Sequence, residues 1–255
     1  MTITSHHNQK LKEIRKLRQR RRWRERSGRF VAEGEDLLAA ADAAGWAAVE
    51  RYCAAGSGLP GTEVDAALLA AASGLGSGTR TLAVYDERWA PAPLGPLCVY
   101  LHALQDPGNV GTILRSAQAF GVSSVALGPG TADPFSLKAV RASMGSVFAV
   151  PLAKVGELRA LPGAKIALVP GTGVALTELS PLGSDGRNKK ATVRPAGLPP
   201  GDITLLIGAE REGLPSEVMG AADHVAHIPI QTDSLNAAMA ATVALYELRT
   251  RMATA

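Results

Sequence analysis

The hydrophobic pattern divides the chain into two parts. Between residues 29 and 86, apolar runs alternate with alanine-rich helical patterns, which predicts a small α/β unit of about 60 residues. Its strands are expected at FVAEG, AAVERYCAA and TLAVYDE, and its helices at EDLLAAADAAG and residues 64–73. Residues 90–96 (APAPLGP) hold three prolines and a glycine, which is typical of a linker.

Beyond this linker, strand-like and helical patterns alternate to the end of the sequence. This order predicts a parallel sheet covered by helices on both faces. Its strands are expected at LCVYLHAL, SSVALG, VFAVPLA, KIALVPG, ITLLIG and HVAHIPI. Its helices are expected at NVGTILRSAQAFG, PFSLKAVRASMG and LNAAMAATVALYELRTRM.

Two stretches of the second part stand out. In the last helical pattern Leu235, Met239, Thr242 and Tyr246 share one face and alanines fill the others. A helix that is apolar nearly all round is expected to be buried. Residues 183–201 are polar and rich in Gly and Pro, so we expect an exposed excursion there.

Charge is distributed unevenly along the chain. Residues 1–30 contain eleven Lys/Arg and two Glu, a net charge of +9, whereas the rest of the chain carries −5. Within residues 10–26, Leu11, Ile14 and Leu17 form a thin apolar stripe at helical spacing. Two interpretations stay open, a solvated tail and a helix that docks on RNA phosphates. The run from residue 20 to 26 is expected to be too charged for burial.

Several classes of protein are disfavoured. Hydrophobic residues make up 46% of the chain, enough for a core, yet no run approaches the roughly 20 apolar residues of a membrane span. The N-terminus lacks the apolar core of a signal peptide, and Cys53 and Cys98 form neither a disulfide framework nor a metal cluster. We therefore expect a cytoplasmic protein without membrane or metal. A basic segment on an acidic body favours a nucleic-acid partner.

Common nucleotide and metal signatures are missing. GTGVAL at 171–176 lacks the third glycine of the dinucleotide fingerprint, and no Walker A pattern exists, so a dehydrogenase-type enzyme is remote. His224 and His227 are three apart on a predicted strand. Their side chains are then expected on opposite faces, which indicates structural residues rather than metal ligands.

The first candidate site lies where a strand crosses into a helix, at QDPGNVGTILR. Ligands of open α/β sheets bind outside the carboxyl ends of strands. Asn109 is well placed as the helix N-cap, and Arg115 falls off the buried stripe near the crevice. An ordinary surface arginine is the alternative interpretation of this segment.

Two more crossings follow in the sequence. In LLIGAEREGLP a buried strand leads into Gly208, Glu210 and Gly213, and glycines let the backbone approach a ligand closely. In IPIQTDSLNAAMA the strand is expected to end at Ile230, with Ser234 or Asp233 capping the last helix. Ser234 and Asn236 would then face the same crevice. A plain turn and simple capping are the alternatives.

Taken together, these segments resemble a known family. N-x-G-x-x-x-R at 109–115, G-x-E-x-x-G-L at 208–214, and I-P followed by S-L-N at 228–236 occur in this order. They closely resemble the three motifs of the SpoU (TrmH-like) family of RNA ribose 2′-O-methyltransferases. RASMG at 141–145 and GRFVAEGEDLL at 28–38 also match that family.

The resemblance implies an organisation for the whole chain. It implies a basic segment at 1–26, an RNA substrate-binding domain at 27–89, a linker at 90–96 and a methyltransferase domain at 97–255. The expected fold is α/β, with a C-terminal trefoil knot that general topology rules would not suggest. The expected partners are RNA, with rRNA favoured over tRNA, and a second copy in a homodimer with the active site at the interface. No DNA is expected.

The resemblance also implies residue roles. Gly208, Ile228 and Leu235 match positions that hold S-adenosylmethionine, and Glu210, Gly213 and Ile230 belong to the same loops. Arg115 matches the catalytic arginine, and the polar residues around it match Asn109, Glu210, Ser234 and Asn236. Because arginine is not normally deprotonated in proteins, two roles stay open for Arg115. It deprotonates the 2′-hydroxyl, or it orients the ribose and phosphate.

The chain departs from the family pattern in two places. The third motif reads SLNAA where SLNVS is usual, so Ala238 stands where a serine is common, and IPI replaces the commoner IPM. These departures leave two hypotheses of different classes. The first is an S-adenosylmethionine-dependent RNA 2′-O-methyltransferase, and the second is a non-catalytic RNA-binding protein on the same scaffold.

Overall fold

The computed structural model describes residues 2–73, 78–179 and 201–254, which form two compact units. The first unit contains residues 1–88, 110–115 and 133–149, and the second contains residues 89–109, 116–132 and 150–255. The polar stretch expected to be an exposed excursion, 183–201, lies outside the described residues except for its last glycine.

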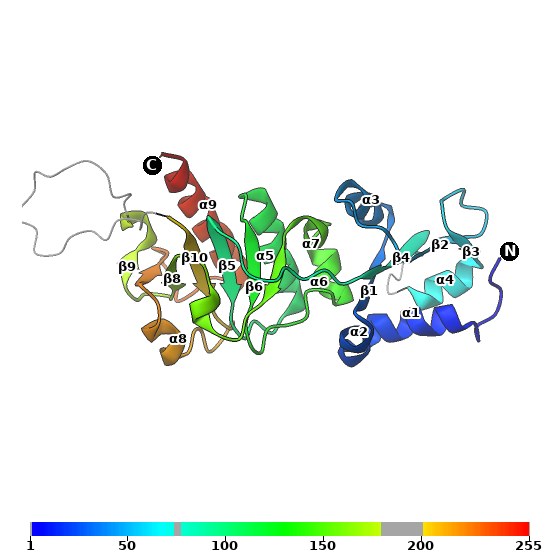
Figure 1. The fold of residues 1–255 in the computed structure, drawn as a ribbon, viewed down its shortest axis with the longest axis horizontal. Helices are drawn as coiled ribbons and strands as arrows, with labels where there is room; N and C mark the ends of the chain where they lie inside the picture. Colours follow the sequence, from blue (N-terminus) through cyan, green and yellow to red (C-terminus); the bar gives the residue numbers. More distant parts are fainter. Residues whose placement is uncertain (1, 74–77, 180–200, 255) are drawn as a thin grey trace, which may run out of the picture. The chain divides into compact units, whose positions relative to one another are not determined.

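In the described part of the first unit, four strands form one sheet in the order β1-β4-β2-β3 (Figure 1). Only the β2–β3 pair is parallel. The strands are β1 (Arg29–Glu33), β2 (Glu50–Ala54), β3 (Thr62–Val64) and β4 (Thr81–Asp86), and the helices are α1 (Gln9–Gln19), α2 (Arg21–Ser27), α3 (Glu35–Ala43) and α4 (Ala66–Ala72). The strands and helices predicted between residues 29 and 86 are confirmed. β3 was not predicted, because three residues are too few to show an alternation.

Helix α1 is part of the hydrophobic core of this unit. Leu11, Ile14 and Leu17 are fully buried and pack in one cluster with Tyr52 and Leu68. The interpretation of residues 10–26 as a solvated tail is therefore wrong. The stripe is thin, but it covers a face of the sheet that would otherwise be exposed to water.

The expectation that residues 20–26 escape burial is wrong for one residue. Arg24 is buried, because its guanidinium pairs with Asp133 at 2.7 Å and donates to the carbonyl of Leu17 at 2.6 Å. A charged group can leave water when an opposite charge and hydrogen bonds replace its hydration. The other arginines of α2 remain exposed.

Residues 133–149 pack on the sheet of the first unit through aromatic side chains. The rings of Phe30 and Phe135 are 4.7 Å apart, and the indole N–H of Trp46 donates to the carbonyl of Phe148 at 2.8 Å. This segment contains α6 (Leu137–Ala142) and α7 (Ser146–Ala149). The strand predicted at VFAVPLA is wrong over its first half, which forms α7, and β7 (Leu152–Lys154) begins only after Pro151.

In the described part of the second unit, seven strands form a wholly parallel sheet (Figure 1). The order is β7-β6-β5-β10-β8-β11-β9, which confirms the predicted α/β class with a parallel sheet. The remaining strands are β5 (Leu97–Leu101), β6 (Ser124–Leu127), β8 (Ala164–Leu168), β9 (Val174–Ala175), β10 (Ile203–Ile207) and β11 (His224–His227). The strand predicted to end at Ile230 ends at His227, because Pro229 cannot donate a ladder hydrogen bond.

Helices and short turns flank this sheet. They are α5 (Pro107–Ala119), α8 (Ser216–Gly220), α9 (Ala237–Thr254) and the 3₁₀ turns η1 (Leu158–Ala160) and η2 (Leu176–Glu178). On one face Tyr100 and Leu206 pack with Leu161 beside η1 and with Val218 of α8. Elsewhere α5 and α9 contact each other through the hydroxyls of Ser116 and Thr242, which are 2.6 Å apart.

Helix α9 is not buried on all sides, contrary to the sequence prediction. Met239 is 63% exposed, Val243 43% and Tyr246 60%, whereas Ala241, Leu245 and Leu248 on the inner side are fully buried. An apolar pattern does not reveal whether its own chain or another molecule covers each face. No helix within the described ranges is long and apolar enough to cross a membrane.

Candidate functional site

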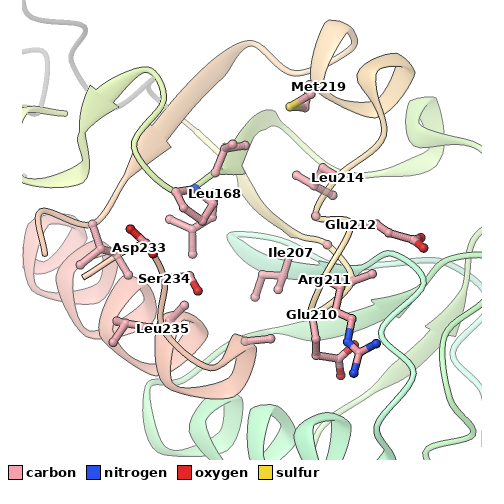
Figure 2. Close-up of a pocket in the computed structure, with 18 of the residues that line it drawn as sticks. Leu168, Ile207, Glu210, Arg211, Glu212, Leu214, Met219, Asp233, Ser234 and Leu235 are labelled. Atoms are coloured by element: carbon pink, nitrogen blue, oxygen red, sulfur yellow. The ribbon is translucent and has the colours of Figure 1, made fainter. Parts of the chain in front are cut away.

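A cavity of about 380 Å³ opens at the carboxyl ends of the central strands (Figure 2). Leu168 ends β8, Ile207 ends β10 and Ile228 follows β11, and all three line it. Figure 2 shows Glu210 and Arg211 on one side of the cavity and Asp233, Ser234 and Leu235 on the other. The position agrees with the rule that open α/β sheets bind ligands beyond the carboxyl ends of their strands.

The turn after β10 is fixed by two glycines. The backbones of Ala209 and Gly213 exchange hydrogen bonds of 3.1 and 3.0 Å, which closes a tight loop with Glu210 inside it. A Cβ on Gly208 would lie 2.2 Å from the carbonyl carbon of Gly213, so only glycine fits there. Gly213 has a φ of +68°, a conformation that side-chain-bearing residues rarely adopt.

Glu210 joins this turn to the start of α5. Its Oε1 accepts from the side-chain amide of Asn109 at 2.9 Å and from the backbone N–H of Asp106 at 3.1 Å. Its Oε2 accepts from the backbone N–H of Gln105 at 3.3 Å. The carboxylate therefore holds the loop that precedes α5 against the turn that follows β10.

These hydrogen bonds keep Glu210 ionised. Partial burial raises the pKa of the carboxyl, but hydrogen bonds from Asn109 and from backbone N–H groups outweigh it, so the pKa lies below its usual value. Both carboxylate oxygens already accept hydrogen bonds, and the group is a poor proton acceptor at neutral pH. Its role in the geometry is to anchor neighbouring segments.

The sequence prediction for the start of α5 is wrong in detail. Asp106 is the N-cap, because its side chain accepts from the N–H of Gly108 at 2.7 Å and Pro107 occupies the first helical position. Asn109 lies in the first turn of the helix, three residues after this cap, instead of capping it. The signal was present in the sequence, since an Asp before a Pro is a common helix start.

The start of α9 also differs from the prediction. Neither Ser234 nor Asp233 caps it; Asn236 does, because its Oδ1 accepts from the N–H groups of Ala238 at 3.0 Å and Met239 at 3.3 Å. The amide Nδ2 of Asn236 donates to the Oδ1 of Asn109 at 3.1 Å. The three segments singled out from the sequence therefore meet in one hydrogen-bonded chain.

The two other polar candidates, Ser234 and Arg115, lie outside this chain of hydrogen bonds. Ser234 is exposed and lines the cavity, but it takes no part in the described hydrogen bonds that connect Glu210, Asn109 and Asn236. Arg115 is exposed on α5 and has no hydrogen-bonding or ionic partner among the described residues. Six residues along a helix from Asn109 correspond to a rise of about 9 Å and a rotation of about 120°. Arg115 is thus separate from the Glu210 network.

The cavity suits a ligand with an apolar ring and polar ends. All six residues expected to hold a cofactor line it: Gly208, Glu210, Gly213, Ile228, Ile230 and Leu235. The backbone N–H groups of residues 230–235 donate to no acceptor in the described part of the chain. Ile230, Asp233, Ser234 and Leu235 of this stretch line the cavity. Aliphatic walls edged by free backbone donors match the requirements of an adenosine group.

One wall of the cavity was not found from the sequence. Leu168 at the end of β8, and Val169 and Pro170 directly after it, line the cavity. They carry no chemically distinctive side chain, so no motif marked them. The rule that ligands bind beyond strand ends, applied to KIALVPG, was the signal that could have found them.

Comparison with known proteins assigns the chain to a family. Residues 96–246, more than half of the chain, match the model of the SpoU rRNA Methylase family. The chain belongs to the SpoU rRNA Methylase family. This confirms the family resemblance inferred from the three motifs. Residues 8–80 of this SpoU-family chain match the model of the MRM3-like substrate binding domain.

Individual relatives differ in how much of the chain they cover. The 23S rRNA (guanosine(2553)-2′-O)-methyltransferase RlmP of Bacillus subtilis is 33% identical over 157 residues, 58% of this chain and 56% of that protein. This SpoU-family chain therefore spans little more than half the length of that relative. An uncharacterized tRNA/rRNA methyltransferase of Synechocystis is 31% identical over 97% of this chain and 93% of its own length.

A solved structure resembles the SpoU-family chain along nearly its whole length. The AdoMet-bound rRNA methyltransferase from Sinorhizobium meliloti superposes with a TM-score of 0.80 and 30% identity, covering 98% of this chain and 97% of that one. The parallel-sheet domain with an additional N-terminal domain is therefore an arrangement that this family uses.

Proposed function

We propose that this SpoU-family chain is an S-adenosylmethionine-dependent RNA 2′-O-ribose methyltransferase that acts on rRNA. The observation that carries the proposal is the hydrogen-bonded chain from Glu210 through Asn109 to Asn236, beside the cavity at the carboxyl ends of the sheet. The Bacillus relative is named a 23S rRNA 2′-O-methyltransferase, and the Sinorhizobium structure is named an AdoMet-bound rRNA methyltransferase. These names support rRNA over tRNA.

The cavity residues would hold the cofactor. Ile228, Ile230 and Leu235 supply aliphatic surface and backbone groups, and the Gly208 turn brings backbone close without side-chain obstruction. When bound, S-adenosylmethionine supplies an electrophilic methyl group on a sulfonium. The contribution of the chain is to place the ribose hydroxyl in line with that methyl group, and positioning alone removes roughly 7–11 kcal/mol of a barrier in favourable cases.

Proton removal from the hydroxyl needs a group other than Glu210, whose oxygens are both engaged. Between the two roles left open for Arg115, we assign positioning. An exposed arginine keeps its proton, and a charged guanidinium donates well to a ribose oxygen and an adjacent phosphate. Ser234 at the rim of the cavity is available to hydrogen-bond the ribose.

The proposed enzyme works as a homodimer with a trefoil knot at its C-terminal end. The exposed apolar face of α9 supports the dimer, since it suits an identical face on a second copy. The insertion of β10 between β5 and β8 supports the knot, because a strand from late in the chain then pairs on both sides with strands from earlier in it. A cytoplasmic location follows from an rRNA substrate.

The domain roles follow the same proposal. Residues 27–89, preceded by the basic segment 1–26 and followed by the linker 90–96, bind the RNA substrate, and residues 97–255 bind the cofactor and transfer the methyl group. The match of residues 8–80 to a substrate-binding domain supports this division. It also supports placing α1 with the RNA-binding part.

Two measurements test the proposal. Purified protein should transfer label from methyl-labelled S-adenosylmethionine to ribosomal RNA, and the product should resist alkaline cleavage at one position, as a 2′-O-methylated nucleotide does. Mapping 2′-O-methyl sites in total RNA from cells with and without the gene identifies the nucleotide. Absence of S-adenosylmethionine binding by calorimetry would instead support a non-catalytic RNA-binding protein.

A further inference from the structure

The outer surface of α1 and α2 carries cations that the carboxylates of the first unit do not neutralise. We call these residues the cation surface: Lys12, Lys16, Arg20, Arg22 and Arg26. None of the five forms an ion pair with a carboxylate of the described residues. Three of them, the arginines, are exposed to solvent.

The acidic residues of the same segment are already engaged. Glu25 pairs with Arg21 at 2.8 Å, and Glu13 faces Arg29 at 3.9 Å. The cation surface therefore keeps its charge in the folded protein. It contributes five of the eleven cations behind the +9 counted over residues 1–30, on a chain whose remainder is acidic.

The cation surface is held in place by the fold. Lys12 and Lys16 are one turn apart on the side of α1 opposite its buried stripe, and Arg22 and Arg26 are one turn apart on α2. The ammonium of Lys16 lies 4.3 Å from the centre of the Trp23 ring, which ties the two helices together. Fixed cations at regular spacing suit a partner with regularly spaced negative charges.

The burial of the apolar face of α1 indicates which negatively charged partner fits the cation surface. An amphipathic basic helix binds membranes by inserting its apolar face among the lipids. Here Leu11, Ile14 and Leu17 are fully buried against the sheet and cannot insert. What remains at the surface is charge alone, and phosphate recognition by Lys and Arg requires nothing more.

We propose that the cation surface binds the phosphates of the RNA substrate independently of sequence. The proposal rests on the proposed function, since it takes RNA to be the substrate. It adds a specific surface on α1 and α2, with Arg22 and Arg26 as the residues most available to phosphate. Contacts of this kind position an RNA, whereas base contacts elsewhere specify it.

The test compares two double variants with equal loss of charge. R22A/R26A removes two cations of the cation surface, and the control R80A/R159A removes two exposed cations elsewhere, each paired with a carboxylate. Binding to a transcribed rRNA fragment is measured by fluorescence anisotropy between 50 and 200 mM KCl. Thermal melting and circular dichroism verify that both variants fold, and K12A/K16A provides an independent pair.

If Arg22 and Arg26 each neutralise one phosphate, the slope of log affinity against log salt falls by about 1.4–1.8 in R22A/R26A. The wild-type protein then loses roughly tenfold more affinity than the variant over that salt range. The control keeps the wild-type slope. An unchanged slope in both R22A/R26A and K12A/K16A overturns the proposal. The proposal is also overturned if these variants bind poly-glutamate more weakly while their RNA binding is unchanged, because that result indicates an acidic protein partner.

Failure of this proposal differs from failure of the proposed function. Methyl transfer and S-adenosylmethionine affinity are measured on the same samples, and R22A/R26A should keep wild-type cofactor affinity. If the salt slope of RNA binding falls in R22A/R26A but the wild-type protein methylates no RNA, the proposed function is wrong and the RNA-binding role of the cation surface stands. If the protein methylates RNA but the salt slope is unchanged in the variants, the proposed function stands and the proposal on the cation surface is wrong.

Discussion

The carboxylate of Glu210 accepts a 2.9 Å hydrogen bond from the side-chain amide of Asn109, across 101 residues of sequence. Asn109 in turn accepts from the side-chain amide of Asn236, which follows Asn109 by 127 residues. One line of hydrogen bonds thus connects the loop after β10, the first turn of α5 and the N-cap of α9. Each of these segments borders the carboxyl end of the sheet, so a change at any one of them is expected to displace the others.

Replacement of Glu210 tests this connection. In E210Q an amide N–H group replaces one of the two accepting oxygens and meets the backbone N–H of Gln105 or of Asp106, so the turn after β10 loses part of its anchor. We expect methyl transfer to fall roughly 100-fold, the order of magnitude expected from a displacement of about 1 Å in the site. The control E212Q lies on the same turn, where Figure 2 shows its side chain directed away from Glu210. Equal activity of the two variants would contradict the anchoring role.

The stability contribution of Glu210 should depend on pH. Hydrogen bonds hold the pKa of its carboxyl below the ordinary value of 4.5, so folding favours the ionised form. The contribution is therefore complete above about pH 4.5 and is lost as the pH falls through the lowered pKa. We expect the difference in melting temperature between wild type and E210Q to be constant from pH 5 to 7 and to shrink below pH 4.5. A difference that grows on acidification would be inconsistent with this direction of shift.

Gly208 should be intolerant of even one methyl group. In G208A the new Cβ would lie 2.2 Å from the carbonyl carbon of Gly213, so the turn must move. We expect the affinity for S-adenosylmethionine, measured by calorimetry, to fall at least tenfold, with a loss of about 1–3 kcal/mol in the free energy of unfolding. G156A is the control, because a Cβ there meets no atom within 4 Å. Wild-type affinity in G208A would show that the close approach does not shape the cofactor site.

Local sequence signals predicted most elements, whereas contacts between distant segments were missed. The parallel sheet and the three crossings from its strands into loops or helices follow from apolar runs and turn residues, which act over a few positions. The burial of Arg24 depends on Asp133, 109 residues away, and no local pattern encodes that pairing. The exposure of Met239 was missed for a related reason, since an apolar face looks the same whichever molecule covers it.

The outer face of α9 provides a test of the homodimer. M239K/Y246E places opposite charges on two residues that are 63% and 60% exposed, so the monomer should fold normally. A face that is buried in a dimer would not tolerate them, and we expect light scattering after gel filtration to report a monomer with little methyl transfer. R159E, an equally drastic change at an exposed site on η1, should leave the assembly unchanged. A dimeric M239K/Y246E variant would place the interface elsewhere.

The two roles of Arg115 predict different behaviour of R115K and R115A. If the guanidinium positions the ribose and phosphate through its charge, R115K should retain a measurable fraction of activity, and R115A should lose methyl transfer while keeping cofactor affinity. The pH dependence of R115K should then parallel that of the wild type, because another group or water accepts the proton. If Arg115 were the proton acceptor, exchange for lysine would move the pH profile, since ammonium and guanidinium groups release protons at different pH. Because Arg115 is exposed and makes no hydrogen bond or ion pair with a described residue, R115A is expected to unfold at the wild-type temperature, which separates a catalytic loss from a structural one.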